Sequence, residues 1–181
     1  CKTADAPTLG LKADFASRGF LSDDYLFRFL GFNRLESLDY SDFERATHVF
    51  DLNRSDLPTE LAGAFDLVFD GGTIEHVFDV KASLANIHRL LKPGGRVIHV
   101  SPSSNHMDHG FYMFSPTLFT DYYSTNGWEI NTARVFRYSP RHETDPWLVS
   151  DYTPGCLEPI SFGGLDDGMY AIILVATKAP G

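Results

Sequence analysis

A carboxylate and an imidazole follow an apolar run near the middle of the chain. The segment FDLVFDGGTIEHVFD, residues 65–79, begins as an apolar run, breaks at DGG and continues with Glu75 and His76. These side-chain types serve as general acids or bases where they reach a bound ligand. Alternatively, His76 caps or packs against the following helix, and the Glu75 carboxylate interacts with the exposed dipole of that helix. The sequence leaves both roles open.

A second group of ionisable side chains lies in SNHMDHGFY, residues 104–112, which contains His106, Asp108 and His109. Two imidazoles and a carboxylate can ligate zinc or iron, but no further ligand pattern accompanies them, so the sequence predicts no metal. A general-base or acceptor-binding role remains open, as does a loop that hydrogen-bonds only to itself. His109 is the preferred base because it precedes Gly110, where the loop can approach a ligand.

The elements that hold these residues follow from the apolar periodicity. Short apolar runs rich in Val, Ile and Phe predict strands buried on both faces. They cover residues 35–40, 46–53, 65–70 and 96–102. Apolar stripes at helical spacing predict helices, each beginning at a capping side chain. These helices cover residues 22–32, 79–95 and 115–127, with the caps Ser22, Asp79 and Ser115.

Strands that alternate with helices predict a parallel sheet with helices on both faces. The last part of the chain differs, because residues 128–138 and 168–178 are long strand patterns separated by an irregular stretch. These two strands would pair most simply as an antiparallel hairpin at one edge of the sheet.

Acidic residues close three of the predicted strands. They are Asp39, Asp51 and Asp70. Because ligands bind beyond the carboxyl ends of the strands in open α/β sheets, we expect the three side chains to line one rim. A single Asp at such a place is more simply explained as a turn cap. Gly71 and Gly72 would let a ligand approach the main chain closely.

Composition narrows the class of protein. The chain has 181 residues, long enough for one domain over residues 1–181 with a core of its own. Its net charge of −9 disfavours a nucleic-acid partner. No apolar window predicts a membrane span, and Cys1 and Cys156 form neither a disulfide framework nor a zinc pair, so we expect a cytoplasmic protein. Oligomeric state does not follow from the sequence.

A family resemblance rests on one continuous segment, FDLVFDGGTIEHVFDVKASLANIHRLLKPGGRVIHVSP, residues 65–102. It resembles the central part of class I S-adenosylmethionine-dependent methyltransferases, in which a strand of this type is followed by EHV, a helix, LKPGG and the next strand. SLDYS and THVFDLN are similar to the ends of the family's second and third strands. The resemblance covers roughly residues 35 to 138.

The resemblance implies a fold and a cofactor. The fold is a three-layer, Rossmann-like methyltransferase sandwich, with a mostly parallel seven-stranded sheet and an antiparallel C-terminal hairpin. The cofactor is S-adenosyl-L-methionine. The family's glycine-rich loop has no G-x-G counterpart here, and the nearest match is PTLGLK with Gly10, near the start of the given sequence. The cofactor-binding residues that the resemblance implies are Gly10, Asp39, Tyr40, Asp51, Leu52, Asp70, Gly71 and Gly72.

The expected reaction is methyl transfer to a small molecule or glycan intermediate. We expect neither nucleic acid nor a membrane as a partner. The candidate catalytic residues are His109, His106, Glu75 and His76. The long segment 140–159 resembles the region where the family builds acceptor specificity, and we interpret it as a substrate lid. Two rivals stay open: a binding or scaffold protein that has lost the cofactor, and a metal-dependent hydrolase using the loop histidines.

Overall fold

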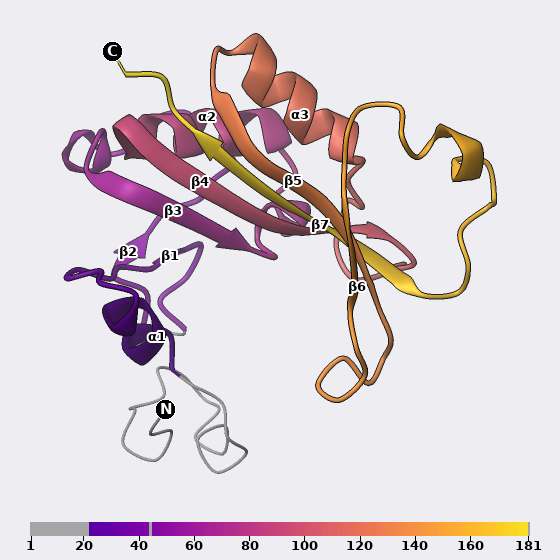
Figure 1. The fold of residues 1–181 in the computed structure, drawn as a ribbon. Coiled ribbons are helices and arrows are strands. Elements are labelled where there is room, and N and C mark those ends of the chain that lie inside the picture. The colour runs from indigo at the N-terminus through magenta and orange to yellow at the C-terminus, as the bar shows by residue number, and fades with distance from the viewer. Residues whose placement is uncertain (1–21, 44, 181) are drawn as a thin grey trace. The chain divides into compact units, whose positions relative to one another are not determined.

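The structure is a computed structural model that describes residues 22–43 and 45–180. The chain divides into two compact units, Cys1–Asp51 and Leu52–Gly181 (Figure 1).

The first unit contains one short helix and a two-stranded sheet. Helix α1 spans Asp23–Phe29, and the Ser22 side chain accepts a hydrogen bond from the Tyr25 backbone N–H, so the predicted cap is confirmed. Strands β1 (Leu38–Asp39) and β2 (His48–Val49) pair in parallel. Both are shorter than the sequence predicts. Their carboxyl ends meet at one edge of this small sheet, because parallel strands run the same way.

The second unit is built on a five-stranded sheet with the order β3-β4-β7-β5-β6 (Figure 1). The strands are β3 (Phe65–Gly71), β4 (Leu91–Ser104), β5 (Glu129–Tyr138), β6 (Leu148–Asp151) and β7 (Met169–Thr177). β3 and β4 pair in parallel, whereas the pairs β4–β7, β7–β5 and β5–β6 are antiparallel.

This topology corrects the predicted sheet. A mostly parallel sheet of seven strands is wrong, because the sheet has five strands and three of its four pairings are antiparallel. The antiparallel pairing of β5 with β7 is confirmed, but β7 lies between β4 and β5 rather than at an edge. The outer strand is β6, which forms inside the segment that the sequence analysis assigned to a lid.

Two helices of the second unit carry the predicted caps. Helix α2 (Val80–Leu90) begins after Asp79, whose side chain accepts from the Ala82 N–H. Helix α3 (Pro116–Thr125) begins after Ser115, whose hydroxyl accepts from the Thr117 N–H. Short 3₁₀ helices, η2 (Thr59–Leu61), η3 (Ile74–His76) and η4 (Glu158–Ile160), complete the unit.

The core lies between one face of the sheet and helices α2 and α3 (Figure 1). Alternate residues of β4 and β7 face it, including the fully buried Val97, Leu174 and Ala176. α2 contributes Leu84 and Ile87 to the same cluster, and α3 contributes Phe119 and Tyr123. Within the described part of the second unit, α2 and α3 therefore cover the same face of the sheet.

Across residues 22–43 and 45–180, none of the helices has the length and apolar character that crossing a membrane requires.

Candidate functional site

The carboxyl end of β3 turns sharply into η3. Gly72 has a φ of +85°, a backbone conformation that residues other than glycine rarely adopt. The Asp70 Oδ1 atom accepts hydrogen bonds from the backbone N–H groups of Thr73 and Ile74, at 3.1 and 3.3 Å. Asp70 thereby caps the 3₁₀ turn that carries Glu75 and His76. Asp70 therefore has the turn-capping role that is the simpler explanation for a single Asp after a strand.

Asp70 also belongs to a buried chain of polar side chains. Its Oδ2 lies 2.6 Å from His99 Nδ1, and His99 Nε2 lies 2.6 Å from the Tyr123 hydroxyl. All three residues are buried, and burial raises the pKa of the Tyr123 phenol far above its usual value. One proton arrangement satisfies all three groups: His99 donates through Nδ1 to Asp70 and accepts through Nε2 from Tyr123. The Asp70 carboxylate thus lies inside the protein rather than on a rim.

Glu75 is buried at the same strand end. Its relative exposure is 1%, and neither carboxylate oxygen has a hydrogen-bond partner among the described residues. Burial raises the pKa of the Glu75 carboxyl, and the nearby Asp70 charge raises it further. A buried carboxyl without hydrogen bonds is costly, so Glu75 calls for a partner that the described residues do not supply.

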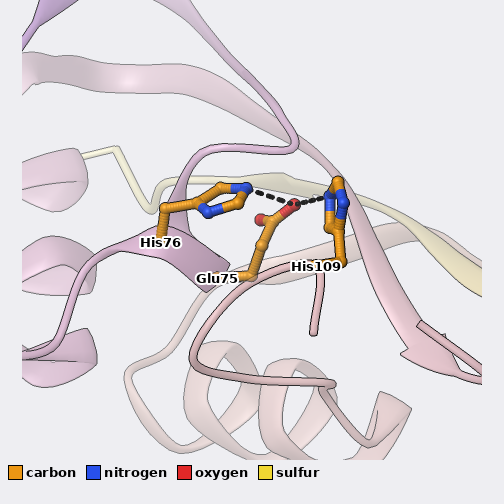
Figure 2. Close-up of side chains that lie close together, drawn as sticks. All are labelled: Glu75, His76 and His109. Carbon is orange, nitrogen blue, oxygen red and sulfur yellow. Dashed lines mark ion pairs between the residues drawn. The ribbon is translucent and has the colours of Figure 1, made fainter. Parts of the chain in front are cut away.

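Two histidines face this carboxylate. Glu75 Oε1 lies 4.0 Å from His76 Nε2 and 3.7 Å from His109 Nε2 (Figure 2). The two imidazole rings meet edge to face with centroids 5.0 Å apart, and both side chains are about half exposed. Figure 2 shows the carboxylate between the rings, with each ring directed toward it. We call these three residues the Glu-His-His cluster.

Backbone hydrogen bonds hold the loop of residues 105–112 against η3. The Glu75 carbonyl accepts from the N–H groups of Phe111 and Tyr112, at 2.8 and 3.3 Å. Asn105 anchors the other end of the loop by donating from Nδ2 to the carbonyls of Asp166 and Gly168. Asn105 and Asp108 both have positive φ, of 61° and 68°. The loop is therefore fixed at both ends in a shape that places His109 beside Glu75.

His106 does not join the cluster. Its Nε2 lies 2.6 Å from the Tyr138 hydroxyl on β5, and burial lowers the pKa of its imidazole. Its ring centroid is 6.1 Å from that of His109. Of the four candidate catalytic residues, the structure therefore brings together Glu75, His76 and His109, and gives His106 a contact with the sheet.

The candidate cofactor residues of the first unit lie at the carboxyl end of its small sheet. Asp39 ends β1, and its Oδ1 accepts a hydrogen bond from the Ser41 N–H at 2.8 Å, while Oδ2 has no hydrogen bond from the residues that the structure describes. Tyr40 follows it directly, and Asp51 comes two residues after β2. Leu52 begins the second unit. Gly10 falls outside the described residues.

An open cavity of about 560 Å³ lies beside the end of β4. Tyr152, Leu157 and Glu158 of the predicted lid line it, so this segment does form one wall of a cavity. The hydroxyl groups that line the cavity come from two stretches of chain, residues 103–117 and 152–161. They belong to Ser103, Ser104, Ser115, Thr117, Tyr152 and Ser161.

Sequence reasoning missed His99 and Tyr123. A usable signal was present, because His99 alternates with Val97 and Ser101 in a strand, and a polar residue on a core-facing position needs a buried partner. The pairing of Glu75 with His109 had no such signal, since 34 positions separate the two residues and only the folded loop brings them together.

Gly110 is expected to tolerate no side chain. A Cβ there would lie 2.9 Å from the Glu75 carbonyl oxygen and 3.2 Å from His76 Nδ1. We expect Gly110→Ala to lower the free energy of unfolding by about 1–3 kcal/mol, the usual cost of forcing atoms into a packed site. Urea unfolding followed by circular dichroism would measure it, with Met107→Ala, an exposed change in the same loop, as the control. Equal stability of the two variants would contradict the packing described here.

Part of the chain matches a known protein family. Residues 32–97 match the family model described as a methyltransferase domain. No curated protein sequence matches the chain. This match, over about a third of the chain, agrees with the resemblance to methyltransferases that the sequence predicts.

Solved structures share the fold across most of the chain. A candidate methyltransferase from Bacillus halodurans has a TM-score of 0.51 at 11% identity, covering 86% of this chain and 98% of that one. A chain from the Haloferax volcanii complex of the Trm112 methyltransferase activator with a candidate methyltransferase scores 0.53 at 18% identity, covering 99% and 88%. A chain from work on thioacetal formation in echinomycin biosynthesis scores 0.51 at 16% identity, covering 87% and 71%. At these identities the likeness shows the fold alone.

Proposed function

We propose that this protein is an S-adenosylmethionine-dependent methyltransferase that acts on a small molecule or glycan intermediate. The observation that carries the proposal is the match of residues 32–97 to a methyltransferase domain. That segment contains Asp39, Asp51, the Gly71-Gly72 turn and Glu75.

Part of the predicted cofactor set fits the chemistry of S-adenosylmethionine. A carboxylate with a free oxygen after the second strand of the family, as at Asp39, suits two hydrogen bonds from vicinal ribose hydroxyls. Leu52 offers an apolar side chain for the adenine ring, and Asp51 is the acidic residue that the resemblance places next to it. Gly72, at a φ of +85°, would present its backbone to the amino-acid end of the cofactor. The buried Asp70 carboxylate bonds to the Thr73 N–H and to His99, so it would act only by positioning this turn.

The acceptor end would combine the cavity beside β4 with the Glu-His-His cluster. A volume of about 560 Å³ suits a small molecule, and the hydroxyl-rich lining suits a polar, oxygen-bearing acceptor such as a sugar. Methyl transfer from a sulfonium needs an aligned acceptor and, for a hydroxyl, removal of its proton. His109 is the proposed base, because its half-exposed Nε2 faces the Glu75 carboxylate. His76 would orient the same group.

Cofactor binding tests the proposal. We expect calorimetric titration with S-adenosylmethionine, and with its demethylated product, to show saturable binding in the micromolar range. Asp39→Ala should weaken binding by about 10- to 100-fold, because a hydrogen bond to a charged group contributes about 1.5–3 kcal/mol. Asp121→Ala on the exposed surface of α3 removes the same charge and should leave binding unchanged.

The scaffold alternative makes the opposite prediction. Absence of heat with millimolar S-adenosylmethionine, in protein shown to be folded, would reject the methyltransferase and support a binding protein that kept only the fold.

A further inference from the structure

Three side chains at the carboxyl end of β3 converge as a set of metal ligands would. Glu75, His76 and His109 each offer one donor atom, and these atoms all lie within 4.8 Å of one another (Figure 2). We propose that the Glu-His-His cluster binds one divalent transition-metal ion, with coordination positions left open.

The buried carboxylate is the first argument. Glu75 is 1% exposed and neither of its oxygens accepts a hydrogen bond from the described residues. Leaving a buried carboxyl without partners costs the whole of its lost hydration. A cation seated on the carboxylate would offset that cost, and the two imidazoles are placed to hold such a cation from the solvent side.

The distances are the second argument. A metal about 2.0–2.2 Å from each ligand in a tetrahedral arrangement requires donor atoms about 3.4 Å apart. The cluster shows 3.7 Å and 4.0 Å from Glu75 Oε1 to the two Nε2 atoms. These two distances exceed the tetrahedral value by a few tenths of an ångström, and the two imidazole donors lie within 4.8 Å of each other. The half-exposed rings of His76 and His109 would move inward on binding while Glu75 stays fixed.

The donor types select the ion. Two imidazole nitrogens with one carboxylate suit zinc or ferrous iron, whereas magnesium and calcium prefer oxygen ligands. Three protein ligands leave at least one position for water or a ligand oxygen, as in catalytic rather than structural sites. The set differs from the one weighed in the sequence, because His109 is a member but His106 and Asp108 are not.

This inference does not depend on the proposed methyl transfer, since metal binding is measured without cofactor or acceptor. We expect metal-free protein to bind one Zn²⁺ per chain in calorimetry, and Co²⁺ to give visible absorption bands of low-coordinate nitrogen and oxygen ligation. Glu75→Gln keeps the shape of the side chain and removes its charge. It should weaken Zn²⁺ binding by about 10- to 100-fold because a neutral amide oxygen is a much poorer ligand than a carboxylate, and His109→Ala should weaken it by a similar factor because it removes one of the three ligands.

His88→Gln is the matched control, because it removes a histidine that packs against Trp128 and has no part in the cluster. It should bind Zn²⁺ as the original protein does. Circular dichroism of each variant confirms that it is folded. Binding that survives unchanged in both Glu75→Gln and His109→Ala, or no stoichiometric binding in the original protein, overturns the proposal.

Discussion

Replacing His109 with alanine is expected to lower kcat for methyl transfer by about 10²- to 10⁴-fold, the usual contribution of a positioned acid or base. The reason is its position, 3.7 Å from the buried Glu75 carboxylate and open to solvent. The dissociation constant for S-adenosylmethionine should change by less than about twofold. Single-turnover kinetics with the true acceptor would measure the first quantity and calorimetry the second.

A chelator separates the two roles open to His109. A ring nitrogen bound to a metal cannot also accept a proton, so chelation should abolish turnover if His109 acts as a ligand and spare it if His109 acts as a base. His88→Gln should match the original protein in both conditions. Full turnover by His109→Ala would remove this residue from the mechanism altogether.

Replacing Asp70 with alanine is expected to lower the free energy of unfolding by about 3–5 kcal/mol. The substitution removes the cap of η3 and leaves His99 Nδ1 buried without its acceptor. The control is Asp66→Ala on the same strand, whose exposed pair with Lys92 should contribute about 1 kcal/mol or less. Urea unfolding of the two variants measures the difference.

A smaller companion change tests the same network from its other end. Tyr123→Phe removes only the hydroxyl beside His99 Nε2 and should cost about 1–3 kcal/mol. If Asp70→Ala unfolds no more easily than Asp66→Ala, the buried chain contributes nothing to stability and the present account of Asp70 is wrong.

The sequence predicts local structure well because its signals are local. Ser22, Asp79 and Ser115 each cap the helix that follows, as their side chains and positions indicate. Strand direction has no such signal, because an apolar run reads the same in a parallel or an antiparallel pair. The mixed sheet arises because β7 inserts between β4 and β5, and no residue of these three strands predicts that insertion.

The candidate site divides in the same way. The strand end carrying Glu75 and His76 was predictable, because the apolar run and the glycines mark it. The burial of Asp70 could have been inferred from register, since Asp70 lies on the same side of β3 as Val68, which packs against the core. The approach of His109 could not, because it depends on the backbone of a loop with two residues at positive φ.

A short stretch of chain links the Glu-His-His cluster to the cavity beside β4. The backbone N–H groups of Phe111 and Tyr112 donate to the Glu75 carbonyl, and the next two residues, Met113 and Phe114, line the cavity. A ligand that moves Met113 together with the backbone of Phe111 and Tyr112 would also move the peptide group of Glu75. Such coupling would be reciprocal: a metal ion bound at the cluster as proposed would change the affinity of the cavity for its ligand by the same factor as the ligand changes the affinity for the metal.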